Sequence, residues 1–169
     1  AAKSDISLLA SATSVTISAE GTYDYSASGP VTVTIDGDRD ATDGTDFVIT
    51  GSKFNDTFAP LEFRELTITG GDGVDTLDMS DADSTVNALT GRANFTSNTT
   101  NIAEFTGIEK FVFDRGADDF TGGSASETIV GGGGNDTLSG GAGDDTFVFA
   151  DTDQLAEIGA NQTFSGGIG

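Results

Sequence analysis

The chain has 169 residues and is strongly acidic, with 28 Asp and Glu against 7 Lys and Arg and a formal net charge of -21. This charge disfavours nucleic-acid phosphates and anionic lipid surfaces as partners, and it favours cations. The chain contains no Cys and no His, so disulfides, thiolate ligands and imidazole ligands are excluded and oxygen ligands remain, which suit Ca²⁺ or Mg²⁺. No apolar run approaches the roughly 18 residues of a membrane span, so we expect no membrane insertion.

Short segments of alternating apolar and polar residues begin near the N-terminus and are separated by Gly and Pro. Such alternation is typical of strands that bury one face. The predicted strands lie at 14–17, 22–25, 31–35, 66–68 and 111–113. No long segment shows helical periodicity, so the chain is predicted to be all-β.

A glycine- and aspartate-rich motif appears within the same region, as GGDGVDTLD at 70–78. A degraded version, GSKFNDTFA at 51–59, keeps Asp56 and Phe58. Glycine permits the positive φ angles of tight turns and leaves room for backbone carbonyls to point inward. Each motif is therefore expected to form a tight turn followed by a short strand.

Four tandem units with a period of nine follow: FDRGADDFT, GGSASETIV, GGGGNDTLS and GGAGDDTFV, covering 113–148. The sixth position is acidic in each, and an apolar residue follows two positions later. The acids are Asp118, Glu127, Asp136 and Asp145, and the apolar residues are Phe120, Ile129, Leu138 and Phe147. A spacing that never slips indicates a structural repeat rather than biased composition.

Two nine-residue units make one coil of 18 residues, so each turn is predicted to stack on its second neighbour. Asp118 then pairs with Asp136, and Glu127 pairs with Asp145. Strands in a sheet lie about 4.8 Å apart, and two carboxylates near that separation repel by about 3 kcal/mol at an effective dielectric of 20. Calcium, which accepts six to eight oxygens, would relieve this repulsion. The alternative is that the glycines only form turns and the acids only keep them soluble.

The motifs resemble the RTX, or haemolysin-type calcium-binding, nonapeptide repeat, whose pattern is GGxGxDxUx with a large apolar residue at U. The resemblance implies a parallel β-roll, or β-solenoid, in which Ca²⁺ lies between stacked turns. It implies the following metal ligand positions: Gly70, Gly71, Gly73, Asp75, Gly116, Asp118, Glu127, Gly131, Gly132, Gly133, Gly134, Asp136, Gly140, Gly141, Gly143 and Asp145. The unit at 122–130 departs from the pattern at Ala125 and Glu127, so we expect about two good calcium sites.

The resemblance also suggests how the chain is organised. Residues 61–169 are predicted to form the β-roll, with an insert at 79–112 that ends near an Ile108-Glu109 element. Residues 1–60 are predicted to form irregular β coils or a cap of the solenoid. The final Gly166-Gly167-Ile168-Gly169 matches the opening of another repeat, so a longer natural polypeptide is expected.

These features together predict a calcium-binding structural segment of a secreted bacterial surface protein, of the adhesin or S-layer type. The family implies type I secretion and folding on external calcium. No catalytic site and no cofactor other than Ca²⁺ are predicted. Candidate partners besides calcium are a second copy of the chain, other surface proteins and polysaccharide. The alternatives are an accessory module of a secreted enzyme and a carbohydrate-binding module.

Overall fold

The computed structural model describes residues 14–19, 21–37, 47–63, 65–97, 102–148 and 163–165, and these residues form strands and turns. No helix among them is long and apolar enough to cross a membrane. The last four residues, where a further repeat is predicted to begin, lie outside this description. The chain divides into two compact units, Ala1–Leu77 with Thr100–Ile108 (unit 1) and Asp78–Thr99 with Glu109–Gly169 (unit 2). The division into segments 1–60 and 61–169 stays a prediction.

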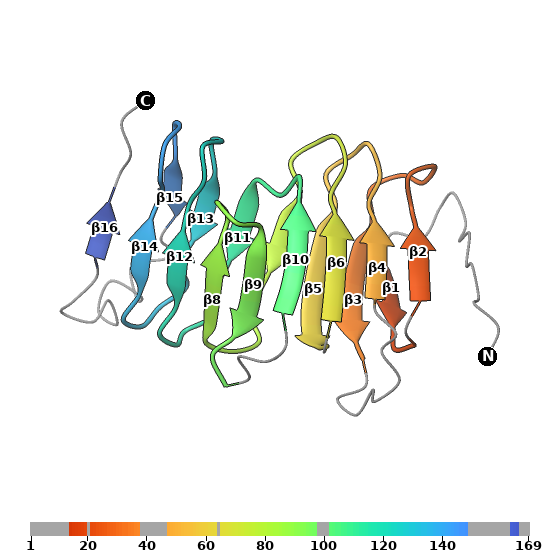
Figure 1. Cartoon of the computed structure of the whole chain (residues 1–169), viewed down its shortest axis with the longest axis horizontal. Coiled ribbons are helices and arrows are strands. Elements are labelled where there is room, and N and C mark those ends of the chain that lie inside the picture. Colours follow the sequence, from red (N-terminus) through yellow and green to blue (C-terminus); the bar gives the residue numbers. More distant parts are fainter. Residues whose placement is uncertain are drawn as a thin grey trace. The chain divides into compact units, whose positions relative to one another are not determined.

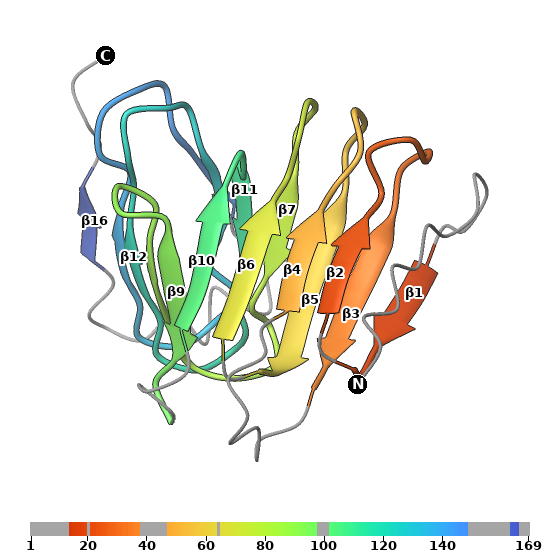
Figure 2. The same ribbon diagram turned by 45° about the vertical axis from the view of Figure 1, so that its right-hand side comes forward.

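Unit 1 consists of two parallel ladders between which the chain alternates (Figures 1 and 2). One ladder contains β1 (Ser14–Ile17), β3 (Thr32–Asp36), β5 (Thr57–Glu62) and β7 (Thr76–Asp78). The other contains β2 (Gly21–Asp24), β4 (Phe47–Thr50), β6 (Glu65–Thr69) and β10 (Ile102–Thr106). The four strands predicted here from alternation are confirmed to within one residue at each end. The predicted all-β parallel roll is confirmed.

The connections of unit 1, rather than its strands, depart from a regular repeat. Ser14 stands opposite Thr32, 18 residues later. The next coil is longer, because Thr32 stands opposite Thr57 and Gly21 opposite Phe47, offsets of 25 and 26 residues. Pro60 lies within β5, where the register with β3 shifts, and of the residues of β5 it is Thr57 and Phe58 that pair with β7. A proline, which has no N–H to donate, is tolerated at such an irregularity.

Unit 2 has the same two-ladder plan (Figure 1). One ladder contains β11 (Lys110–Val112), β13 (Thr128–Val130) and β15 (Thr146–Val148). The other contains β9 (Arg92–Phe95), β8 (Ser84–Asn87), β12 (Asp119–Thr121), β14 (Thr137–Ser139) and β16 (Thr163–Ser165). All of these pairs are parallel except the β8–β9 hairpin. The predicted insert at 79–112 therefore contains the β8–β9 hairpin, strand β11 and, in unit 1, strand β10.

The core of unit 2 lies between its two ladders. The apolar repeat residues Phe120, Ile129 and Leu138 are each no more than 1% exposed. Phe120 of β12 lies 4.9 Å from Phe111 of β11 and 6.0 Å from Phe113, measured between ring centroids. Because these rings belong to different ladders, their contact holds the two ladders together. The apolar position of the nonapeptide therefore supplies the core, and the turns lie at its edges.

We expect Phe120→Ala to lower the free energy of unfolding by about 3–5 kcal/mol, because it leaves a cavity between the ladders. Phe54→Ala is the control, since Phe54 is 42% exposed, and it should change stability by less than about 1 kcal/mol. Urea unfolding at saturating calcium measures both changes. Equal effects of the two substitutions would contradict a core centred on Phe120.

Candidate calcium-binding turns

The acidic repeat residues of unit 2 lie at the ends of turns that stack on one another. The backbone N–H of Asp118 donates to Asp136 Oδ1 at 3.1 Å, and the N–H of Glu127 donates to Asp145 Oδ1 at 3.0 Å. Each bond joins residues 18 positions apart. The predicted stacking of these two pairs is therefore confirmed. The strands that follow keep the same offset, since Asp119 stands opposite Thr137 and Thr128 opposite Thr146.

These hydrogen bonds occupy only part of each carboxylate. Within the described part of unit 2, Asp118 Oδ2, Glu127 Oε2 and Asp145 Oδ2 are buried and have no hydrogen-bond partner. Asp118 is only 1% exposed and Glu127 only 3%. Buried polar atoms of native proteins are nearly always paired, because removing a charged oxygen from water without compensation is costly. The turns therefore present oxygens that a bound cation would satisfy.

The pKa values of Asp118 and Glu127 are raised, as expected for buried carboxyls with few hydrogen-bond partners. Burial raises the pKa of Asp118 to about 7, and the nearby charges of Asp114 and Asp136 add to this, although hydrogen bonds from Ser84 oppose it. Burial likewise raises the pKa of Glu127 to about 7, with Asp145 contributing in the same direction. In the absence of a cation, both carboxyls would tend to hold protons close to neutral pH.

The glycines of these turns lie directly against carbonyl oxygens of the turn one coil earlier. Gly134 has a φ of 112° and Gly143 a φ of 114°, which side chains rarely adopt. A Cβ at Gly134 would overlap the carbonyl oxygen of Gly116, and a Cβ at Gly143 would overlap that of Ala125. The space between stacked turns is therefore lined by backbone oxygens as well as carboxylates, and only glycine allows the turns to approach so closely.

This set of ligands fits a hard divalent cation. Among the residues that the structure describes, no three acidic side chains lie close enough together to bind one metal ion. A cation in unit 2 would therefore take two carboxylates from stacked turns, one coil apart, and complete its shell with carbonyls and water. Calcium accepts such irregular shells of six to eight oxygens, whereas magnesium requires a near-ideal octahedron.

The structure places the predicted ligand positions in three pairs of stacked turns. In unit 2, Gly116 and Asp118 lie one coil from Gly131–Gly134 and Asp136, and Glu127 lies one coil from Gly140, Gly141, Gly143 and Asp145. In unit 1, Gly70, Gly71, Gly73 and Asp75 belong to a turn stacked on residues 51–56, where Asp56 N–H donates to Asp75 Oδ1 at 2.7 Å. Their binding of calcium stays a prediction.

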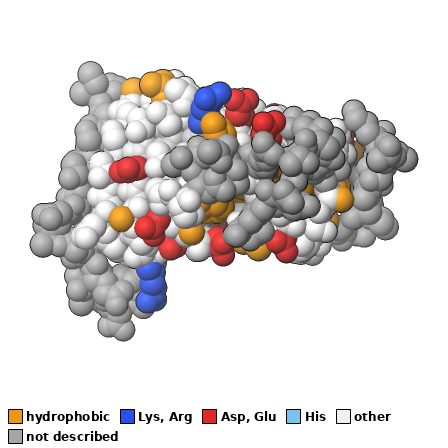
Figure 3. Space-filling view, turned by 60° about the horizontal axis from the view of Figure 1, so that its bottom comes forward, with side chains coloured by type: hydrophobic (Ala, Val, Ile, Leu, Met, Phe, Trp, Pro, Cys, Tyr) orange, Lys and Arg blue, Asp and Glu red, His pale blue; other side chains and the backbone are white. Residues whose placement is uncertain are grey.

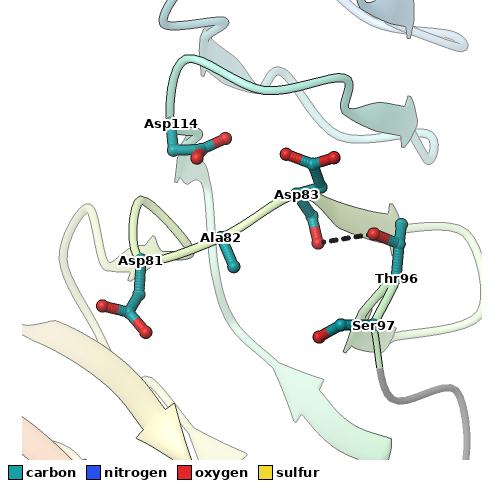
Figure 4. Close-up of a pocket in the computed structure, with 6 residues that line it drawn as sticks. All are labelled: Asp81, Ala82, Asp83, Thr96, Ser97 and Asp114. Carbon is teal, nitrogen blue, oxygen red and sulfur yellow. Dashed lines mark hydrogen bonds between the residues drawn. The ribbon is translucent and has the colours of Figure 1, made fainter.

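A further acidic feature of unit 2 was not predicted from the sequence. A pocket of about 450 Å³ is lined by Asp81, Ala82, Asp83, Thr96, Ser97 and Asp114. Asp114 points toward Asp83, whereas Asp81 points away (Figure 4). Thr96 N–H and Oγ1 donate to the carbonyl of Asp83 at 2.8 and 3.1 Å. Asp83 and Asp114 follow no repeat spacing, so only the stacking of their turns identifies them as neighbours.

Ser84 also has a role that sequence reasoning missed. It stands in register with Asp118, since Thr85 pairs with Asp119. Its N–H and Oγ both donate to Asp118 Oδ1, at 2.6 and 3.1 Å. The stack that contains Asp118 and Asp136 therefore ends at a serine, which donates two hydrogen bonds to Asp118. On the face that Figure 3 shows, acidic side chains lie at several separate places.

A comparison with family models finds four copies of the RTX calcium-binding nonapeptide repeat, matched to residues 67–84 and 114–151. These matches include the motif at 70–78 and the tandem array in which the acids stack. No curated protein matches the chain.

Without calcium, the chain should become less stable as the pH rises from about 4 to above 7. Asp118 and Glu127 have folded-state pKa values of about 7, well above those of unfolded carboxyls. The stability that they contribute is fully present below about pH 4 and is lost as the pH passes through about 7. Melting temperatures measured in chelator across this range test the expectation.

The double variant Asp118→Asn, Glu127→Gln should flatten this pH profile. Asp119→Asn, which removes a charge at an exposed neighbouring position, is the control and should leave the slope unchanged. A melting temperature of the parent chain that increases between pH 4 and 7 would contradict the assignment.

Gly134→Ala should destabilise the calcium-saturated chain by at least about 1 kcal/mol, because it combines positive φ with a clash. Gly133→Ala in the same turn is the control: a Cβ there would meet only Arg115 Cγ, at 3.9 Å. Urea unfolding compares the two. If both substitutions were tolerated, the close stacking of these turns would be wrong.

Proposed function

Since the chain carries RTX calcium-binding nonapeptide repeats, we propose that it is a calcium-stabilised structural segment of a secreted bacterial surface protein, of the adhesin or S-layer type. The observation that carries the proposal is the stack of carboxylates with buried oxygens that have no hydrogen-bond partner, those of Asp118, Glu127 and Asp145. Such groups destabilise a fold unless a proton or a cation compensates them. A calcium-rich exterior supplies the cation.

In this proposal, two pairs of turns in unit 2 hold calcium. Asp118 and Asp136, with the carbonyl of Gly116, form one ligand set, and Glu127 and Asp145, with the carbonyl of Ala125, form the other. The motif at 70–75 in unit 1 supplies a further set through Asp75. Bound calcium contributes two positive charges and replaces the water that the carboxylates lost on burial.

Calcium dependence would give the chain different states on the two sides of the cell envelope. At low cytosolic calcium, the acidic repeats repel one another and unit 2 stays unfolded, which suits passage through a type I secretion channel. At millimolar external calcium, binding to the folded state alone shifts the equilibrium by mass action. Unit 2 would then fold outside the cell, where the segment has its structural role.

The role we propose is structural rather than catalytic. The acids lie in turns of the same design. In this proposal, each pair of acids binds calcium between two stacked turns. An enzyme would instead need groups with different roles converging on one cleft. A stiff, repeating scaffold is consistent with a spacer or lattice element, and the chain's partners are then another copy of itself, other surface proteins or polysaccharide.

A calcium titration of the chain from chelator, followed by circular dichroism, tests the proposal. We expect a gain of β signal with calcium and little with magnesium. The double variant Asp136→Ala, Asp145→Ala should lose this gain, because it removes one carboxylate from each pair in unit 2. The matched control is Asp119→Ala, Asp144→Ala, which deletes two exposed acids from the same tandem array and should keep the gain.

Two outcomes would overturn the proposal. One is a chain whose β signal in chelator is already complete and indifferent to both ions. The other is an equal loss of calcium response in the two double variants, which would mean that net charge, rather than the stacked carboxylates, governs folding.

A further inference from the structure

The turn at residues 51–56 of unit 1 has the same place in its coil as a calcium-binding turn, but its acid is fully hydrogen-bonded. Asp56 is 1% exposed. Its Oδ1 accepts from the N–H of Val31 at 2.8 Å and from Ser52 Oγ at 3.0 Å. Its Oδ2 accepts from the N–H of Ser52. Both carboxylate oxygens are therefore satisfied by the protein itself.

Ser52 is the residue that makes this turn different. It stands at the second position of the motif, where the turns at 122–127 and 140–145 have Gly123 and Gly141. Its hydroxyl donates to Asp56 and accepts from the N–H of Phe54 at 3.1 Å. A single side chain thus bridges the two ends of the turn. In unit 2, by contrast, Glu127 accepts only the N–H of Gly123, at 3.2 Å, and its Oε2 has no partner.

Neutral groups also join this turn to its neighbour. Val74 N–H donates to Asn55 Oδ1 at 3.0 Å, and Thr76 N–H donates to the carbonyl of Asp56 at 2.8 Å. Beneath the turns, Phe58 and Leu77 are both 0% exposed. The two turns are therefore held together by hydrogen bonds and apolar packing. Neither carboxylate oxygen of Asp56 needs a cation.

We propose that the donors of Ser52 and Val31 take the place of a cation in this turn, so that strands β3–β6 of unit 1 fold without calcium, whereas unit 2 requires it. The contrast between the units rests on the function proposed above, but the folding of unit 1 in chelator does not. A chain built this way has one permanently ordered half and one half whose order reports the calcium concentration. Calcium binding at Asp75 would then stabilise the neighbouring turn at 70–75.

Hydrogen exchange of the full chain, measured by mass spectrometry in chelator and in millimolar calcium, separates the two units. We expect strands β3–β6 to be protected in both conditions and strands β11–β15 to gain protection only with calcium. Exchange of β3–β6 that is as fast in chelator as in the unfolded chain would overturn the inference. Calcium-independent protection of β11–β15 would instead overturn the proposed function and leave the result for unit 1 standing.

Ser52→Gly tests the role of the serine directly, because it restores the Gly-Gly opening of the motif. In chelator, exchange of β5 should become at least about tenfold faster, since the hydrogen bond from the Ser52 hydroxyl to the buried carboxylate is lost while the two N–H donors remain. Calcium should restore the protection, as in unit 2. Ser52→Thr keeps the hydroxyl and should keep protection in chelator.

Ser124→Gly is the matched control, because Ser124 is an exposed serine in the turn at 122–127. It should leave the exchange of β5 unchanged. If Ser52→Gly also left it unchanged, or if calcium failed to restore the lost protection, Ser52 would not be a substitute for a cation.

Discussion

The structure depends on the burial of carboxylates between stacked turns. A parallel ladder with an offset of 18 residues brings the same position of every second repeat side by side, and in this chain that position is acidic. Like charges at such a separation repel, and burial removes the water that would screen them. The fold is therefore stable only if something compensates each buried carboxylate.

One form of compensation is present in the structure, and a second is the one that we propose. In the turn at 51–56, the hydroxyl and N–H of Ser52 and the N–H of Val31 satisfy Asp56. In the tandem array, Asp118, Glu127 and Asp145 each keep an oxygen without a partner, and a divalent cation is the compensation that we propose. Hydrogen bonds are always present in the folded chain, whereas a cation depends on its concentration. The same backbone turn can therefore be permanent or conditional, depending on the hydrogen-bond donors that surround its acid.

The apolar parts of the fold follow from local patterns. Strands such as β1 and β3 were predicted from alternation because a half-buried strand needs that period, and Phe120, Ile129 and Leu138 were recognised because the repeat fixes their spacing to the acids. The path of residues 79–112 was harder to predict from the sequence. The pairing of β8 with β9 as a hairpin, and of β10 with β6, depends on contacts between distant segments that no periodic pattern encodes.

The sequence by itself determined the all-β class, the 18-residue coil and the pairs Asp118–Asp136 and Glu127–Asp145, because a strict repeat transmits its register to every copy. Only the tertiary structure decided which carboxylate oxygens have partners. The hydrogen bonds of Ser84 to Asp118 and of Ser52 to Asp56 were not predictable in this way. For Ser84 the reason is an offset of 34 residues outside the repeat, and for Ser52 it is that a serine in place of glycine looks like decay of the motif until its hydroxyl is seen bonded to the acid.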